Sequence, residues 1–361
     1  TTREGLRGLR VDWDALEARA APRSIFLHHA WADAAWSWRE HEGAPLILVM
    51  RRDGQARGIV PLCRHRGPGG ARTLAWLSVP DNQEADLLAA PDDRAAVVEA
   101  LADWLVRPGG GWSRLSLAQL PAHGASLPIL LSALQARRMP TARRAAGQNH
   151  AIDLTDTWED FYARRSRRLK KGNNLVANRL HRAGDVAVTR LTGERITPAV
   201  VATLRQLSGE SWKQGTGTTF DRPGPGAFLD CLVEHGRREG WLVVWLLELD
   251  GRAIASELHL EYGGRAHALR ADYAEDAAEL SPGSYLNWRI IERLFDSGLQ
   301  RYELGPGANP YKQRWSEQEL PLATMDAWRP TAAGRLRAGW HLRLRPRLAA
   351  LKRRADGNAG C

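Results

Sequence analysis

The sequence predicts a mixed α/β protein in which two similar units follow one another along the chain. Three observations support this prediction. Asp-Gly and Gly-Gly pairs separate apolar runs at matching places in the two halves. A stretch of helical period follows the third apolar run in each half, and a further strand-like run follows that stretch. The length of 361 residues and the hydrophobic content of 43% are sufficient for two cores.

The first half opens its repeat with three predicted strands. They read PLILVMRR from residue 45, ARGIVPLCRHR from residue 56 and ARTLAWLSV from residue 71, and Asp53-Gly54 and Gly69-Gly70 separate them. Asp-Gly between apolar runs is typical of a hairpin, because a type I′ turn needs positive φ at both central residues. A helix over 92–107 and a strand over 112–120 are expected next.

The second half repeats this order. Predicted strands cover 241–249, 252–262 and 265–273, a helix covers 281–297, and a strand covers 299–305. Nearly the same offset separates each turn glycine from its counterpart in the first half. We therefore expect two mixed α/β domains, 1–150 and 151–330, rather than one long sheet, followed by a basic tail or helix over 331–361.

The halves are joined by a segment of predicted helix. A capping pattern at Thr157 starts this helix, and Gly172-Asn173-Asn174 is expected to break or kink it before Gly184. A second helical region is expected over 198–212. The Gly- and Thr-rich stretch over 213–226 has the composition of a flexible loop that acts as a lid.

The net charge of +10 comes from two segments. Residues 164–182 and 335–354 each contain Lys and Arg but no acid, and acids outnumber bases in the rest of the chain. Basicity this local argues against a general nucleic-acid binder. No apolar run approaches the ~18 residues of a membrane helix, and the first residues do not resemble a signal peptide, so a cytoplasmic location is expected. The cysteines and histidines show no metal-ligand spacing, so no metal is expected.

Several short motifs occur in a recognisable order. They are Val60-Pro61-Leu62, the linker SRRLKKGNN, Asp250-Gly251 with Ile254-Ala255, Ala271-Asp272-Tyr273, Ser281-Pro282-Gly283, Gly305, and Tyr311-Lys312 with Trp315. Their order over residues 25–330 resembles the GNAT acyltransferases. In detail it looks like the CelD-type acetyltransferases of exopolysaccharide and cellulose biosynthesis, and less closely like the tandem-GNAT FemABX aminoacyl transferases. The resemblance implies acyl-CoA as the co-substrate and no prosthetic group, with aminoacyl-tRNA as the alternative donor.

The start of the second-half helix is the expected donor site. Helix N-termini bind anions because their first N–H groups lack partners and the helix dipole is positive there. Ser281 as N-cap, Pro282, Gly283 and Ser284 would form a phosphate cradle, although a plain helix start explains the same residues. The usual GNAT phosphate loop is absent. The first half places Asp92 and Asp93 at the equivalent position, which repels phosphate and predicts a degenerate, structural domain.

Acyl transfer to an amine also needs a proton acceptor and hydrogen-bond donors to the developing oxyanion. Glu257 and Asp272 are the candidate bases, and Tyr273 is a candidate acid for the leaving thiolate. By resemblance, Lys312 lies near the donor or acceptor phosphates. The residues assigned to substrate binding are Arg270, Tyr311 and Trp315, and for Trp315 a place in the core is the stronger alternative.

These residues predict an acyl-CoA-dependent acyltransferase that acts on an amine of a sugar, an amino acid or another metabolite. A FemABX-like aminoacyl transferase is the first alternative, with the basic segment 164–182 contacting tRNA rather than being a solvated helix face. A non-catalytic protein bound to a polysaccharide synthase or a membrane is the second. The C-terminal segment, rich in Arg, Leu and Trp, is either a peripheral membrane contact or a frayed tail.

Overall fold

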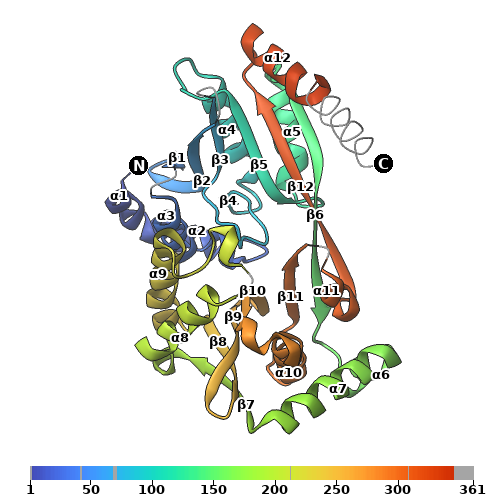
Figure 1. Cartoon of the computed structure of the whole chain (residues 1–361). Coiled ribbons are helices and arrows are strands. Elements are labelled where there is room, and N and C mark those ends of the chain that lie inside the picture. The colour runs from blue at the N-terminus through green and yellow to red at the C-terminus, as the bar shows by residue number, and fades with distance from the viewer. Residues whose placement is uncertain (1, 41–42, 68–70, 212, 308, 345–361) are drawn as a thin grey trace.

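The computed structural model describes residues 2–40, 43–67, 71–211, 213–307 and 309–344 (Figure 1). Within them the strands form one twelve-stranded sheet with the order β1-β2-β3-β5-β12-β6-β11-β10-β9-β8-β7, and β4 pairs with β2. The expectation of mixed α/β architecture is confirmed. The expectation that the halves do not share a sheet is wrong, because two long strands, β6 and β12, join them.

The first half contains the predicted order of three strands, a helix and a strand, together with β4, α5 and β6, which are not among the predicted elements. They are β1 (Ala44–Arg52), β2 (Gln55–Arg66), β3 (Arg72–Trp76), β4 (Leu88–Ala89), α4 (Arg94–Val106), β5 (Arg114–Pro121), α5 (Ser126–Ala136) and β6 (Thr141–Asp153). Asp53 and Gly54 have φ of 52° and 76°, as the first hairpin turn requires. The predicted Gly69-Gly70 turn lies outside the described residues.

The second half repeats the pattern. Its elements are β7 (Val186–Thr192), α8 (Pro198–Gly209), α9 (Pro223–Glu239), β8 (Leu242–Leu249), β9 (Arg252–Tyr262), β10 (Arg265–Tyr273), α10 (Pro282–Leu294), β11 (Arg301–Pro306), α11 (Pro310–Trp315) and β12 (Gln318–Trp328). The face of α10 with Leu286, Ile290 and Leu294 is buried, as its periodicity predicts.

The last strand returns to the first half. β12 pairs antiparallel with β5, from Leu322 opposite Pro121 to Trp328 opposite Arg114, and with β6 on its other side. β6 continues past β12 and pairs with β11. Figure 1 shows these two strands running between the halves. The predicted domain boundary at residue 150 thus falls inside β6, and residues 318–328 complete the sheet of the first half.

The linker departs from its prediction. α6 (Trp158–Ala163) ends before residue 167, and α7 (Arg167–Ala183) then runs without a break through Gly172-Asn173-Asn174. The break lies at 164–166 because the Ser166 hydroxyl accepts from the Leu169 N–H and starts a new helix. Asn173 is buried, and its amide donates to Tyr162 Oη at 3.3 Å, which ties the middle of α7 to α6. The predicted loop over 213–226 is shorter than expected, since α9 takes its last four residues.

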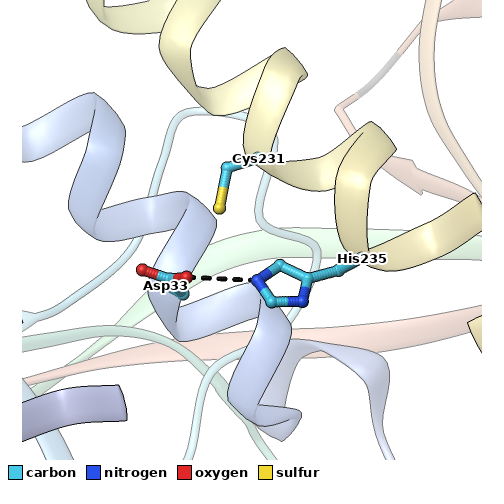
Figure 2. Close-up of side chains that lie close together, drawn as sticks. All are labelled: Asp33, Cys231 and His235. Carbon is cyan, nitrogen blue, oxygen red and sulfur yellow. Dashed lines mark hydrogen bonds and ion pairs between the residues drawn. The ribbon is translucent and has the colours of Figure 1, made fainter. Parts of the chain in front are cut away.

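Three N-terminal helices, α1 (Arg3–Gly8), α2 (Arg10–Glu17) and α3 (His29–Arg39), precede the first strand. Figure 2 shows Asp33 of α3 facing Cys231 and His235 of α9. Their potential ligand atoms lie within 4.8 Å of one another. Arg238 bonds His235 Nδ1 at 2.9 Å and can only donate, so His235 Nε2 carries the proton that it shares with Asp33 at 3.1 Å.

Arg3 completes this group. Its guanidinium donates to Asp33 Oδ1 at 3.1 Å and lies 3.9 Å from Cys231 Sγ. The Asp33 carboxylate is therefore bonded by two donors, and the nitrogen of His235 that faces it has no free lone pair for a cation. We describe the group as a hydrogen-bonded staple between α3 and α9.

The chain ends, within its described part, in α12 (Ala332–Gly339) and the π-helical turn η6 (Trp340–Leu344). The rest of the predicted tail, 345–361, lies outside the described residues. No described helix combines the length and the apolar run needed to cross a bilayer.

Candidate active site

A cleft opens where two parallel strands diverge. β10 and β11 pair only from Arg265 opposite Arg301 to His267 opposite Glu303. β11 then continues along β6, while β10 continues along β9 with a bulge between Ala268 and Arg270. A cleft of about 470 Å³ lies beyond the divergence, between the end of β10, the start of α10 and α11.

The first half closes one side of this divergence. Gln83 donates from Nε2 to the Ala268 carbonyl at 2.8 Å and contacts His267 Nδ1 at 3.0 Å through its Oε1. Gly305, at φ 77°, allows this approach, since a Cβ there would lie 3.0 Å from Gln83 Nε2. Gln83 has no signal in the sequence, because its partners Ala268 and His267 are 185 and 184 residues away in the chain.

The start of α10 forms one wall. Ser281 occupies the N-cap position in the left-handed region, at φ 55°, and Pro282 is the first helical residue, as predicted. The Ser281 hydroxyl makes no capping bond, so the expected side-chain cap is absent. Gly283 and Ser284 line the cleft. A Cβ on Gly283 would meet Tyr273 Cδ1 at 3.6 Å, an ordinary contact, so the missing side chain leaves room in the cleft rather than preventing a clash.

Glu257 is part of a buried polar network that lines the cleft. It is 3% exposed and accepts from His259 Nε2 at 2.8 Å and from Tyr302 Oη at 2.6 Å. Burial alone would raise the pKa of this carboxyl, but the bonds from His259 and Tyr302 outweigh it and hold the pKa below its usual value. Glu257 therefore carries a negative charge within this buried network.

Asp272 lies behind the cleft rather than in its wall. Its carboxylate pairs with Lys213 Nζ at 2.9 Å and Arg270 Nε at 3.1 Å, and both of these cationic side chains line the cleft. The Arg270 guanidinium also lies 4.2 Å from the centre of the Phe220 ring and pairs with Asp81 at 3.4 Å. Asp272 therefore positions two cations, and a carboxylate paired in this way is a weak candidate base.

Lys312 brings a partly buried ammonium group to the cleft. Its Nζ donates to the Pro306 carbonyl at 2.7 Å, which fixes it at the first turns of α11. Burial lowers the pKa of Lys312 to about 8, with Lys213 acting in the same direction and Glu257 opposing it. A substantial fraction of this side chain is therefore neutral at mildly alkaline pH.

Aromatic residues separate the cleft from the core. Tyr273 and Tyr311 both line it, and burial raises the pKa of Tyr311 above its usual value. Trp315 is 3% exposed and stacks on Phe161 with ring centres 6.3 Å apart, so it belongs to the core, as the stronger alternative predicted. One face of Trp315 lines a smaller groove of about 110 Å³.

This smaller groove continues the cleft toward the basic helix. It shares Ser284 and Tyr311 with the cleft and is lined on its other side by Arg168 and Gly172 of α7 and by Arg314. The cleft and the groove together lead from Lys312 past the start of α10 to the exposed arginines of α7.

A second cavity, of about 260 Å³, lies between the two halves. Its charged lining residues are paired within the protein: Arg94 with Asp86 at 3.6 Å, and Arg265 with Glu303 at 3.4 Å. At the start of α4, Asp93 pairs with Arg19 at 3.1 Å. In the first cleft, by contrast, the Lys312 ammonium is bonded to a backbone carbonyl, and the start of α10 lines the same space. We therefore take the first cleft as the candidate active site.

Comparisons with known proteins show what the chain is similar to. Residues 163–313 match the model of the acetyltransferase (GNAT) domain. The whole chain resembles three solved structures. The C-terminal (DUF2156) domain described as that of a lysylphosphatidylglycerol synthetase from Agrobacterium fabrum has a TM-score of 0.60 at 14% identity, covering 92% of this chain and 93% of that one.

The second is FemX, with a TM-score of 0.57 at 10% identity, covering 90% of this chain and 96% of that one. The third is L-PGS from Bacillus licheniformis, with a TM-score of 0.54 at 12% identity, covering 87% of this chain and 96% of that one. No curated protein matches the sequence. Identities this low establish a common fold alone. The second half of the chain is thus similar to the acetyltransferase (GNAT) domain over residues 163–313, and the chain as a whole has the fold of FemX.

Proposed function

We propose that this protein transfers an acyl group from an acyl-CoA thioester to an amine in the cleft between β10, α10 and α11. The observation that carries the proposal is the placement of Lys312. Its partly buried ammonium, with a pKa of about 8, lines the same open space as the start of α10.

We assign the residues at the cleft separate roles in the reaction. The start of α10, with Pro282, Gly283 and Ser284, receives the donor phosphates, and Lys213 and Arg270 add positive charge at the end of β10. The amine attacks the thioester carbonyl carbon, so that a C–N bond forms and the C–S bond breaks. Neutral Lys312 takes the amine proton, and the Tyr273 hydroxyl gives a proton to the leaving thiolate. The Glu257 network stabilises the positive charge that develops on Lys312. The first half serves as a structural partner: Asp81 lines the cleft, and Gln83 holds β10 beside it.

One observation favours a second candidate, an aminoacyl-tRNA donor. The groove beside the cleft ends at the basic helix α7, whose Arg168 and Lys171 are exposed. The fold shared with FemX is consistent with this alternative. The CelD-type affiliation, the amine acceptor and the cytoplasmic location remain predictions.

Two measurements separate these functions. In calorimetric titrations with acetyl-CoA and longer acyl-CoAs, we expect binding that Gly283→Ala weakens and that Lys171→Ala, on the exposed face of α7, leaves unchanged. Transfer to a panel of amino sugars and amino acids, followed by mass spectrometry, identifies the acceptor.

The opposite pattern would support the other candidates. Transfer of an aminoacyl group from charged tRNA that is lost with Arg168→Ala and Lys171→Ala supports the aminoacyl-tRNA function. A non-catalytic binding protein is supported if no acyl-CoA binds, no charged tRNA serves as a donor, and the cellular phenotype of the protein is unchanged in the Lys312→Ala variant.

A further inference from the structure

The C-terminal helical segment presents apolar side chains to solvent. Among the residues the structure describes, five large hydrophobic side chains are exposed, and three of them lie within 336–342: Leu336 at 76%, Trp340 at 49% and Leu342 at 41%. The other two, Val11 and Leu175, are isolated on α2 and α7. Leu336 and Trp340 are four residues apart on a helical segment, so their side chains are neighbours and form an apolar cluster, whereas Leu342 lies on a different side of the segment. Adjacent exposed apolar side chains mark a contact surface more often than single ones do.

The orientation of this segment is fixed by its opposite face. Gly334 and Ala338 are buried, and a Cβ on Gly334 would lie only 2.0 Å from the Arg329 carbonyl oxygen, so α12 packs directly on backbone. The His341 ring lies 5.9 Å from the Trp328 ring of β12. The outward position of Leu336 and Trp340 therefore follows from packing of the helix.

Positive charge surrounds the apolar cluster. Arg335, Arg337 and Arg343 are exposed beside it, and the sequence has no acid from 335 to 354. Leu and Trp side chains flanked by arginines are the combination found in helices that lie in the interface of anionic membranes, where the apolar groups enter the headgroup boundary and the cations bind lipid phosphates. A groove on another protein would have to match both the cluster and a dense ring of cations.

We propose that this basic apolar face, formed by Leu336 and Trp340 with Arg335, Arg337 and Arg343, docks the protein on a membrane surface rich in anionic phospholipids. α12 lies at the end of the molecule opposite α10 (Figure 1). Docking there leaves the cleft open and does not require the acceptor to be a lipid, so the proposal does not depend on the proposed function.

Co-sedimentation of the full chain with lipid vesicles tests the proposal. We expect binding to vesicles of phosphatidylcholine with phosphatidylglycerol that weakens with added salt, and much weaker binding to phosphatidylcholine alone. Leu336→Ala with Trp340→Ala should lower the partition coefficient about tenfold or more, because the apolar anchor is lost. Replacing Arg335 and Arg337 by Gln should lower it by about fivefold per charge.

The matched control is Val11→Ala with Leu175→Ala, which also removes two exposed apolar side chains and should leave binding unchanged. All these side chains are exposed, so the thermal midpoints should stay at the wild-type value, which confirms that folding is intact. Equal vesicle binding by the Leu336/Trp340 variant and the wild type, or no binding to anionic vesicles, would overturn the proposal. Acyl transfer to a soluble amine should be the same in that variant, so failure of docking and failure of the proposed activity are distinguishable.

Discussion

Replacing Lys312 by Met should stabilise the protein at neutral pH while it removes the proposed proton acceptor. The pKa of Lys312 is lowered from 10.5 to about 8, so the folded state disfavours the ammonium form. At ~1.4 kcal/mol per pH unit, holding the charged side chain costs about 3 kcal/mol at pH 7. Met fills a similar volume without charge but loses the bond to the Pro306 carbonyl, worth about 1 kcal/mol. The expected net gain is about 2 kcal/mol.

The stability gained by the Met variant depends on pH. Between pH 8 and 10.5 the unfolded chain binds more protons at Lys312 than the folded chain, so wild-type stability rises with pH in this window. At pH 10 the cost of the charged form falls below about 1 kcal/mol, and the advantage of the Met variant disappears.

Urea unfolding of both proteins at pH 7 and pH 10 measures this difference directly. Other titrating groups cancel when the two proteins are compared at the same pH. A variant that is less stable than the wild type at pH 7, or a difference that is equal at the two pH values, would refute the assignment of a buried, destabilised ammonium group. In parallel, we expect the acyl-transfer rate of the Met variant to fall about 10²- to 10⁴-fold, the usual contribution of a positioned base.

Three further changes test other parts of the structure. Gly283→Ala should reduce the affinity for acyl-CoA at least tenfold in calorimetry, because the added methyl group enters the cleft. The thermal midpoint should not change, because the methyl group makes no clash. Unchanged affinity would exclude donor binding at the start of α10. Glu257→Gln should lower the free energy of unfolding at pH 7, because the ionised Glu257, with its lowered pKa, stabilises the folded state. This stabilisation disappears as the pH falls through the pKa of Glu257, so the variant should lose less stability toward acid pH than the wild type does. Urea titrations in which both proteins lose the same stability toward acid pH would contradict this. Asp33→Asn should destabilise by about 3 to 5 kcal/mol, because it leaves Arg3 and His235 without their anionic partner; a loss below ~1 kcal/mol would show that the staple is dispensable.

The elements that could be predicted are those specified by neighbouring residues. The Asp250-Gly251 turn, the buried face of α10 and the start of that helix at Pro282 all depend on local backbone preferences and periodicity. The start of α9 was not predicted: Pro223 is a local signal for a helix start, but the Gly- and Thr-rich composition of 213–226 predicts a loop there.

The site was predictable only in part, for a physical reason. Glu257, Tyr273 and Lys312 line the cleft, and a local pattern singles out each of them in the sequence. Glu257 lies on the strand after the Asp250-Gly251 turn, Tyr273 ends the next strand, and Lys312 belongs to the Tyr311-Lys312 motif. Lys213 comes from an irregular stretch, and only tertiary packing brings its ammonium to the Ala271 carbonyl at 2.7 Å. The pairing of Asp272 with two cations was equally hidden, since whether a strand carboxylate is free depends on residues distant in the sequence.

The return of β12 to the first half has a consequence for how the chain is made. During synthesis, residues 1–150 leave the ribosome long before residues 318–328, which lie between β5 and β6 in the finished sheet. Until then both of these strands have an unpaired edge, which is prone to associate with other chains. An isolated amino-terminal fragment should therefore aggregate. If co-expression of the remaining segment keeps this fragment in solution, the two halves complete their folding together.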